Sequence, residues 1–551
     1  MQTTVDPVVE AEYREKGWWG TECLTDVIRR LANTNPQGTA FVDEHGDRMS
    51  WRVYDEVSDR IASALMSTDL ARGECVIVFM ADGPLVHAAF VGAEKAGLIV
   101  MGIGHRAGEA ELNHLVGKSH ARGIVTLATH RDEASTALVA RLRENHPALQ
   151  HHIVINGPST AAAIAVIGGT KAHNRDPGLA RRIDARRVGP SELFFLNSTS
   201  GTTGLPKCVM QNQNRWFFFN QIAVDYGDLT PYESWMSVVP APFGFGLWTA
   251  HFTPTLIGAP CAVMSHFNAE GMIRLVEREK VTVLCCVSTQ FIMMLNSPAL
   301  DDHDLSSLRM MFTGGEAIPY ARALEFEERT GAMVMNFYGS NETGMLSGTR
   351  SNDDRQNRLT TGGRLIPEMH VRLYTPEGER VEGDRGKGVP ACFGPAMGPG
   401  YYEDVEANGK LFTPDGWMLM GDVVTIDDEG WLTVVGRTSD FIIRGGKNIS
   451  APAVEDEVAT HPSVKMVSVV PAPDPVFGER VAAYVELHDG TALSLDDLKA
   501  HLTSRGVTKE WYPEYLFVVE QLPRASGGKV AKGDLKKDAA LRVASASATT
   551  G

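Results

Sequence analysis

Strand-like apolar runs alternate with amphipathic, alanine-rich segments along much of this chain. The runs 75–80 (CVIVFM) and 123–127 (GIVTL) flank the amphipathic segment 85–97 (LVHAAFVGAEKAG). Similar runs follow at 192–196 (ELFFL) and 281–287 (VTVLCCV). This alternation predicts strands layered with helices, and therefore an α/β fold. The later runs end in turns rich in Gly, Ser or Thr, and α/β folds place their ligand chemistry at such strand ends.

The sequence changes character beyond about residue 383, where short strand-like pieces with many glycines replace the alternation. A chain of 551 residues also exceeds what one hydrophobic core usually organises. We therefore predict a large N-terminal domain of layered α/β subdomains over 1–436, a hinge at 437–440 and a small α+β domain over 441–540. The polar, low-complexity segment 541–551 is expected to be disordered.

Charge and cysteine content narrow the classes of function. The formal net charge is −16, so we expect no general attraction to nucleic acid, and an anionic ligand must be bound by local groups. The 7 cysteines include no CxxC pair, which fits neither a disulfide framework nor a zinc site and predicts a cytoplasmic location. No export signal is evident, and charged residues interrupt the most apolar stretch, 75–104, so no membrane span is expected.

The segment 197–207 (NSTSGTTGLPK) directly follows a strand-like run and carries the strongest chemical signal. Its glycines permit backbone conformations closed to other residues, while its hydroxyls and N–H groups can surround an anion. A loop without a ligand is the alternative interpretation. The segment differs from the common P-loop because Pro206, not glycine, precedes the lysine. The predicted phosphate-binding residues are Thr199, Ser200, Gly201, Thr202, Thr203, Gly204 and Lys207.

The stretch 199–207 (TSGTTGLPK) resembles the ATP-triphosphate loop of the adenylate-forming superfamily, which includes acyl- and aryl-CoA ligases, luciferases and the adenylation domains of peptide synthetases. The resemblance runs from roughly residue 20 to 536. It departs from the family at Cys208, where glycine is usual, and at Gln213, where histidine is common. The resemblance implies ATP and Mg²⁺ as cofactors, and a small C-terminal domain that closes for adenylation and then rotates for thioester formation.

A second group of residues follows another apolar run, in 313–316 (TGGE) and 338–343 (YGSNET). By resemblance, Tyr338 stacks on the adenine and Glu342 helps to hold Mg²⁺; an aromatic face suits a purine and a carboxylate suits a hard cation. Asn341 stands where the family usually has a Thr or Ser that contacts the α-phosphate, and its amide can still donate. The remaining nucleotide-binding residues implied by the resemblance are Gly314, Gly315, Glu316 and Gly339.

Two further segments complete the implied nucleotide site. Asp422 would accept the ribose hydroxyls, and Arg437 would add a charge-assisted donor nearby. Lys529 lies in 522–530 (LPRASGGKV), and adenylation needs a cation where a carboxylate meets the α-phosphate. We therefore expect Lys529 to be catalytic, together with Glu342 and Lys207 of the segments above. The alternative interpretations are a surface lysine for Lys529 and a turn residue for Asp422.

The resemblance also extends to the second half-reaction. It places the hinge at Ser439, where Asp or Lys is usual, and 444–449 (RGGKNI) resembles a loop that borders the pantetheine tunnel in CoA ligases. A plain β-turn with solvated charges is the alternative. The candidate CoA-binding residues are Arg444, Gly445, Gly446 and Lys447.

The segment 216–248 is rich in aromatic residues, and within it 240–246 (PAPFGFG) resembles a strand end that borders the acyl site of the family. No Asp or Lys is evident there to bind an ammonium group, so an apolar acid is favoured over an amino acid. Core packing is the alternative for each aromatic residue. The acyl-pocket candidates are Phe243, Phe245, Trp248, Gly314 and Met345.

Together these features predict an acid–CoA ligase that makes acyl-AMP and pyrophosphate from an apolar carboxylic acid of open size and Mg·ATP, and then acyl-CoA with the co-substrate CoA. One alternative is an enzyme that stops at acyl-AMP and passes it to a separate carrier protein or partner ligase. A second alternative is a non-catalytic nucleotide-binding regulator. The identity of the acid and the oligomeric state, a homodimer included, stay open.

Overall fold

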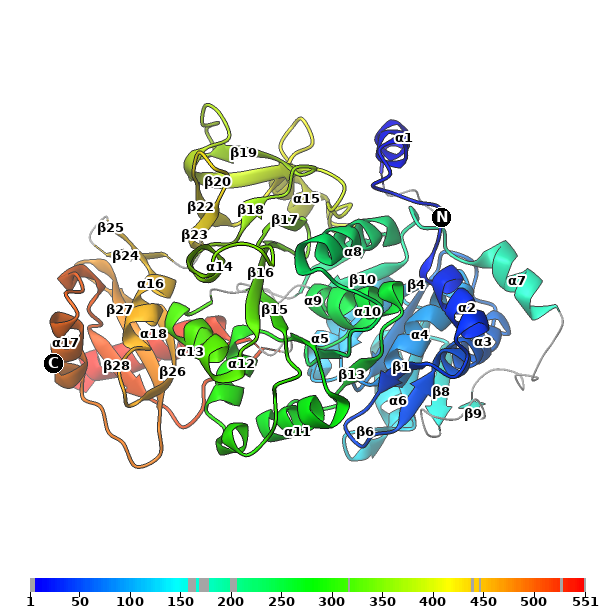
Figure 1. Cartoon of the computed structure of the whole chain (residues 1–551), viewed down its shortest axis with the longest axis horizontal. Coiled ribbons are helices and arrows are strands. Elements are labelled where there is room, and N and C mark those ends of the chain that lie inside the picture. Colours follow the sequence, from blue (N-terminus) through cyan, green and yellow to red (C-terminus); the bar gives the residue numbers. More distant parts are fainter. Residues whose placement is uncertain are drawn as a thin grey trace.

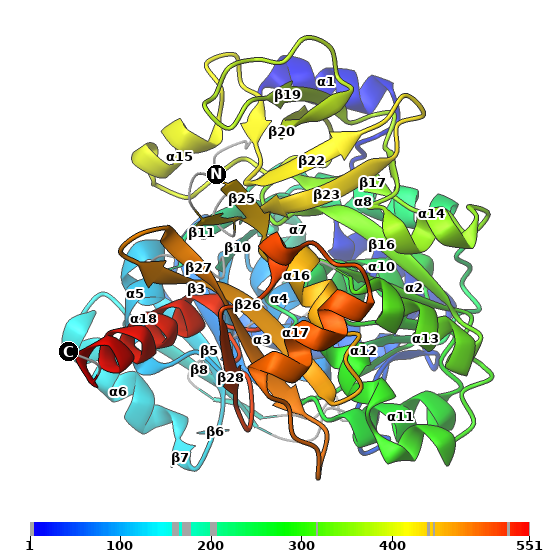
Figure 2. The same cartoon turned by 90° about the vertical axis from the view of Figure 1, so that its left-hand side faces the viewer.

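The computed structural model describes residues 5–156, 165–167, 178–198, 206–315, 318–437, 441–444, 447–525 and 529–549. Figure 1 shows a large body with three main sheets and the short pair β6 (Thr129–His130) and β7 (Glu133–Ala134), and the C-terminal residues form a smaller unit at one end. Figure 2, viewed from that end, shows the smaller unit lying in front of the large one. The predicted fold class, a large layered α/β domain with a small α+β domain, is confirmed.

The first sheet has 7 strands in the order β11-β10-β4-β3-β5-β8-β9. Its centre is parallel, and β3 is buried on both faces, as expected when helices cover both sides of a parallel sheet. The predicted strands and helix appear here as β3, β5 and α4 (Pro84–Lys95). The strands are β3 (Cys75–Met80), β4 (Ile99–Gly104), β5 (Gly123–Leu127), β8 (His151–Asn156), β9 (Ala165–Ile167), β10 (Phe195–Ser198) and β11 (Cys208–Gln211).

The second sheet has 9 strands in the order β18-β17-β16-β15-β14-β12-β13-β1-β2, and its central strands are parallel. One hydrophobic core joins it to the first sheet, because Val78 of β3, Phe312 of β15 and Trp248 belong to the same buried cluster. The strands are β1 (Thr39–Val42), β2 (Arg48–Ser50), β12 (Trp235–Ser237), β13 (Cys261–Val263), β14 (Val283–Cys285), β15 (Met310–Gly314), β16 (Met333–Ser340), β17 (Gly344–Gly348) and β18 (Arg364–Leu365).

Helices pack on these two sheets. The helix α8 (Gln213–Gly227) carries much of the aromatic-rich segment, and a π-helix (Leu247–Phe252) carries Trp248. Such π-helical turns occur often at functional sites. The helix α12 (Ser288–Leu295) follows β14 and faces the small domain.

The glycine-rich region that follows forms an antiparallel sheet at the top of Figure 1. Its strands are β19 (His370–Tyr374), β20 (Gly386–Phe393), β21 (Met418–Leu419), β22 (Asp422–Ile426) and β23 (Leu432–Arg437). Because β22 and β23 form a hairpin, Asp422 pairs directly with Arg437.

The small unit has its own core, which contains Ile442, Val454 and Leu498. Its sheet combines β24 (Phe441–Arg444), β25 (Lys447–Ser450), β26 (Val464–Asp474), β27 (Gly478–Leu487) and β28 (Tyr515–Val518) with helices α16 (Ala451–Val458), α17 (Leu495–Ser504) and α18 (Lys532–Thr549). Of the predicted hinge, 438–440 lie outside the described residues.

The C-terminal segment differs from its prediction. The structure continues α18 through 541–549, where disorder was expected, and 550–551 lie outside the described residues. The reason is local: this stretch is rich in alanine and contains neither Pro nor Gly, so nothing stops the helix.

All 7 cysteines are buried and free, in agreement with the expectation that they form no disulfide framework. Within the described ranges, every helix is too short or too polar to span a lipid bilayer.

Candidate active site

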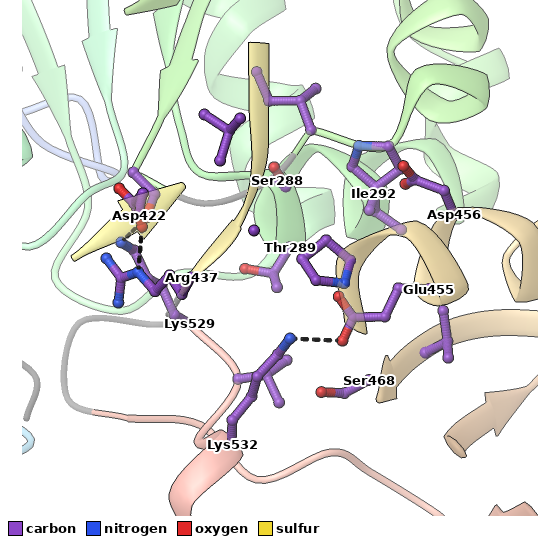
Figure 3. Close-up of a pocket in the computed structure, with 18 of the residues that line it drawn as sticks. Ser288, Thr289, Ile292, Asp422, Arg437, Glu455, Asp456, Ser468, Lys529 and Lys532 are labelled. Atoms are coloured by element: carbon purple, nitrogen blue, oxygen red, sulfur yellow. Dashed lines mark hydrogen bonds and ion pairs between the residues drawn. The ribbon is translucent and has the colours of Figure 1, made fainter. Parts of the chain in front are cut away.

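A cavity of about 730 Å³ lies between the large and small domains, and residues of both line it (Figure 3). The large domain contributes the ends of β15 and β16 and the hairpin β22–β23, and the small domain contributes α16 and the loop before α18. The cavity brings together six residues predicted to bind the nucleotide: Gly315, Tyr338, Gly339, Asp422, Arg437 and Lys529.

Asp422 is the centre of a hydrogen-bonded group at one wall of this cavity. The Tyr338 hydroxyl donates to its Oδ2 atom at 2.9 Å, and the Arg437 Nε atom donates to its Oδ1 atom at 3.1 Å. Burial, and then the nearby Asp422 charge, raise the pKa of Tyr338 well above its usual value, so the phenol keeps its proton. Each carboxylate oxygen retains acceptor capacity for a further donor, such as a ribose hydroxyl.

Lys529 reaches across from the small domain. Its Nζ atom donates to the Gly315 carbonyl oxygen at 2.5 Å. Gly315 has a φ of +77°, a conformation that favours glycine, and a Cβ atom added there would lie 2.9 Å from the lysine Nζ. The end of β15 therefore needs glycine both for its backbone and for the approach of the lysine.

Glu342 and Lys207 do not line this cavity among its described residues, but a tyrosine connects them. The Tyr401 hydroxyl donates to the Glu342 Oε1 atom at 2.7 Å, and the Lys207 Nζ atom lies 4.7 Å from the centroid of the Tyr401 ring. Tyr401 was not predicted from the sequence, where it is visible only as an aromatic residue after Gly400. In the structure, Tyr401 pairs with Val209 of β11.

Asn341 makes contacts that the sequence did not predict. Its Nδ2 atom donates to the Asn197 Oδ1 atom at 2.9 Å, and the Asn197 Nδ2 atom donates back to its Oδ1 atom at 2.9 Å. The Gln211 Nε2 atom donates to the same Asn197 oxygen. These hydrogen bonds among three amide side chains connect the loop after β16 to β10. The last residue of β10 directly precedes Thr199, the first residue of the predicted phosphate-binding set.

The acyl-pocket candidates occupy different environments. Trp248 is only 1% exposed and stacks on Phe219 at 4.7 Å and on Phe245 at 5.4 Å, and Met345 is equally buried. Phe243 is half-buried beside Gly104 of β4. At Gly314 a side chain would meet the backbone, because an added Cβ atom would lie 2.8 Å from the Phe337 carbonyl oxygen. Trp248 and Met345 thus pack as core residues.

Two of the candidate CoA-binding residues, Arg444 and Lys447, belong to the part of the chain that the structure describes. Arg444, the last residue of β24, forms an ion pair with Glu514 at 2.5 Å, and Lys447, the first residue of β25, forms one with Glu510. Neither lines the cavity among the described residues.

Other predicted residues lie outside the described residues: Thr199, Ser200, Gly201, Thr202, Thr203, Gly204, Glu316, Ser439, Gly445 and Gly446.

Known proteins resemble the whole chain. The "Medium-chain fatty-acid--CoA ligase" of Escherichia coli (strain K12) is 27% identical over 97% of this chain and 93% of its own length. The "Salicylyl-CoA synthase / salicylate adenylyltransferase" of Streptomyces sp is 29% identical over 95% of each. The solved structure of the anthranilate CoA ligase AuaEII in complex with anthranoyl-AMP aligns with a TM-score of 0.82 at 22% identity, covering 96% of this chain and 98% of that one, which shows the shared fold.

Family models match the two domains separately. The model described as AMP-binding enzyme matches residues 28–402, and the model described as AMP-binding enzyme C-terminal domain matches residues 453–529. The first match covers well over half of the chain, so the predicted family and enzyme class are confirmed. This chain belongs to the AMP-binding enzymes, as a member of the adenylate-forming superfamily on its acid–CoA ligase branch.

Proposed function

We propose that this enzyme activates an apolar carboxylic acid in two steps. The acid's carboxylate oxygen attacks the α-phosphorus of ATP, and the bond from that phosphorus to pyrophosphate breaks, which leaves acyl-AMP. The CoA thiol, after losing its proton, then attacks the acyl carbonyl carbon and releases AMP. The observation that carries the proposal is the approach of Lys529 to Gly315, beside the group that Tyr338, Asp422 and Arg437 form.

Each residue of that group has a distinct role in the first step. Asp422 accepts hydrogen bonds from the ribose, with its orientation fixed by Tyr338 and Arg437. The Lys529 ammonium offsets the charge that builds up as the carboxylate meets the α-phosphate. Because Tyr338 and Asp422 belong to the large domain and Lys529 to the small one, the site is complete only when the two domains are together, as the contact between Lys529 and Gly315 holds them here.

The donor set at Glu342 fits magnesium. The structure shows no cluster of three or more His, Cys, Asp or Glu side chains suited to a metal ion among the described residues. Mg²⁺ typically binds one or two carboxylates together with substrate phosphates and waters, and Glu342 supplies one carboxylate. When bound there, Mg²⁺ would screen the triphosphate charges, while Tyr401 orients the carboxylate.

The CoA step is proposed from the resemblance of 444–449 to a pantetheine-tunnel loop and from the relatives. The E. coli relative and AuaEII are named as CoA ligases. The Streptomyces relative is named both as a CoA synthase and as an adenylyltransferase. The alternative, an enzyme that stops at acyl-AMP and passes it to a carrier protein or partner ligase, therefore stays open. Product analysis with and without CoA separates the two, because only a complete ligase yields acyl-CoA.

The test of the first step is acid-dependent exchange of labelled pyrophosphate into ATP, with apolar acids of different size. Lys529→Ala is expected to abolish exchange while ATP still binds in calorimetry, because the cation acts on the reacting oxygens. Lys537→Ala is a matched control, since this lysine is 82% exposed on α18. Undiminished exchange by Lys529→Ala would refute the proposed role of Lys529.

A further inference from the structure

Arg215 is a buried arginine near the start of α8, next to the loop that carries Glu342. Only 1% of its surface is exposed. Its Nε atom donates to the Ala396 carbonyl oxygen at 2.8 Å, and its Nη1 atom donates to the Gln211 Oε1 atom at 2.5 Å. The carbonyl oxygens of Asn341 and Glu342 accept from Nη1 at 3.0 Å and from Nη2 at 3.4 Å. The guanidinium is therefore held by four acceptors.

All four acceptors are neutral. Among the residues the structure describes, no Asp or Glu forms an ion pair with Arg215, whereas the buried Arg358 pairs with Glu327 at 2.6 Å. Burying a charge without an opposite charge is costly. The fold thus keeps a positive charge in a place where burial opposes it.

The contacts of Arg215 connect both sides of the proposed triphosphate site. Gln211 ends β11, the strand that follows Lys207. Asn341 and Glu342 lie in the loop between β16 and β17. A Cβ atom added at Gly398 would lie 2.7 Å from the Arg215 Nη1 atom. The loop that contains Gly398 therefore packs closely against the guanidinium.

We propose that Arg215 is a positioning residue that fixes the Glu342 loop against β11, and whose buried charge offsets the negative charge that Mg·ATP brings to the site. This inference rests on the proposed function, because it requires a triphosphate between Lys207 and Glu342. Arg215 acts through the carbonyl groups that it holds and through its field, which is stronger in a buried position than in water. Its effect on affinity should therefore grow with the negative charge of the ligand.

Calorimetry with Mg·ATP, AMP and adenosine tests this dependence in Arg215→Gln. The substitution removes the charge but keeps an amide donor. ATP is expected to bind about tenfold more weakly, as for loss of hydrogen bonds to a charged group, AMP less so, and adenosine as in the wild type. An equal loss for all three ligands, or no loss for ATP, would overturn the proposal.

Arg309→Gln is the matched control. This arginine also donates to backbone carbonyls, those of Gly227 and Asp228, but it pairs in addition with Glu233 at 2.7 Å and precedes β15 at the end of the sheet opposite the cavity. The Arg309→Gln variant should bind all three ligands as the wild type does. If the wild type binds no ATP, the proposed function is wrong. If the wild type and Arg215→Gln bind ATP equally well, the proposed function stands and only the role of Arg215 is wrong.

Arg215→Lys keeps the proposal testable if the glutamine variant does not fold. The lysine retains the charge but cannot reach four acceptors with one ammonium group. Its melting temperature should fall while the ratio of ATP to adenosine affinity stays as in the wild type. A reduced ratio in this variant would contradict the role given to the charge.

Discussion

The nucleotide cavity and the aromatic cluster around Trp248 are neighbours with different construction. In the cavity, polar side chains at strand ends meet through single hydrogen bonds, as Tyr338 and Arg437 do at Asp422. In the cluster, rings from α8 and the π-helix stack in the core. The strand β16 serves both, because Phe337, the residue before Tyr338, lies 5.4 Å from the Trp248 ring. The difference implies that cavity residues can be changed at little cost in stability, whereas changes to cluster residues cost several kcal/mol.

Trp248→Ala should have the largest effect and tests the cluster. Removing a fully buried tryptophan is expected to lower the free energy of unfolding by roughly 3–5 kcal/mol, measured by urea denaturation. The affinity for ATP should be unchanged in the folded fraction. Phe243→Ala, at a half-buried position, should cost less stability and instead raise KM for the acid. Equal stability losses in the two variants would remove the distinction between core and pocket wall.

Gly315→Ala tests the cavity with a closely matched control. Gly315 and Gly331 have φ values of +77° and +74°, so alanine strains both backbones equally. A Cβ atom at Gly315 crowds the Lys529 Nζ atom, whereas one at Gly331 meets nothing within 4 Å. Both variants should lose about 1 kcal/mol of stability.

Only Gly315→Ala should slow acid-dependent pyrophosphate exchange, by about tenfold, which corresponds to about 1.4 kcal/mol. Equal rates in the two variants would mean that the contact between Gly315 and Lys529 has no part in adenylation.

The buried pair of His87 and His251, whose effect appears only at acidic pH, lies in the aromatic region, where Phe41 and Phe90 surround it. Their Nδ1 atoms lie 3.3 Å apart. Burial lowers both pKa values, that of His251 to about 3. The folded state therefore keeps both rings neutral, while the unfolded chain takes up protons below pH ~6.5, so stability is lost as the pH falls from there towards 3.

His251→Phe should flatten this loss by up to about 1.4 kcal/mol per pH unit, measured as the free energy of unfolding between pH 7 and 4. His370→Phe, at an exposed position on β19, should leave the slope unchanged. An unchanged slope in His251→Phe would show that this pair does not control the acid sensitivity of the fold.

The sequence predicted the residues of the cavity better than those of the cluster. The cavity residues Tyr338, Asp422, Arg437 and Lys529 stand in motifs that resemble the adenylate-forming superfamily. Without that resemblance, each of them fits a turn or a surface position equally well. The strands β3 and β5, by contrast, were clear, because continuous apolar runs of that length are buried strands in α/β folds. For the aromatic residues, the sequence does not distinguish a core position from a position in the pocket wall. Trp248 and Phe243 stand in the same aromatic-rich segment, and only their packing in the structure shows that Trp248 is the more buried.

The supporting residues were missed because their contacts join distant parts of the chain. Tyr401 is 59 residues from Glu342, and Arg215 is 126 residues from Asn341. Neither residue type in its local sequence indicates such a contact. The amide pair of Asn341 and Asn197, 144 residues apart, was hidden for the same reason.

Adenylation as proposed requires that Lys529 of the small domain meets a nucleotide bound to the large domain. A crystal structure with a non-hydrolysable acyl-adenylate analogue would show whether it does. We predict the ribose at Asp422, the adenine against Tyr338, and the Lys529 Nζ atom within hydrogen-bonding distance of the analogue's phosphate-like group. An analogue bound away from Asp422, or a Lys529 side chain turned away from it in the closed enzyme, would contradict the account.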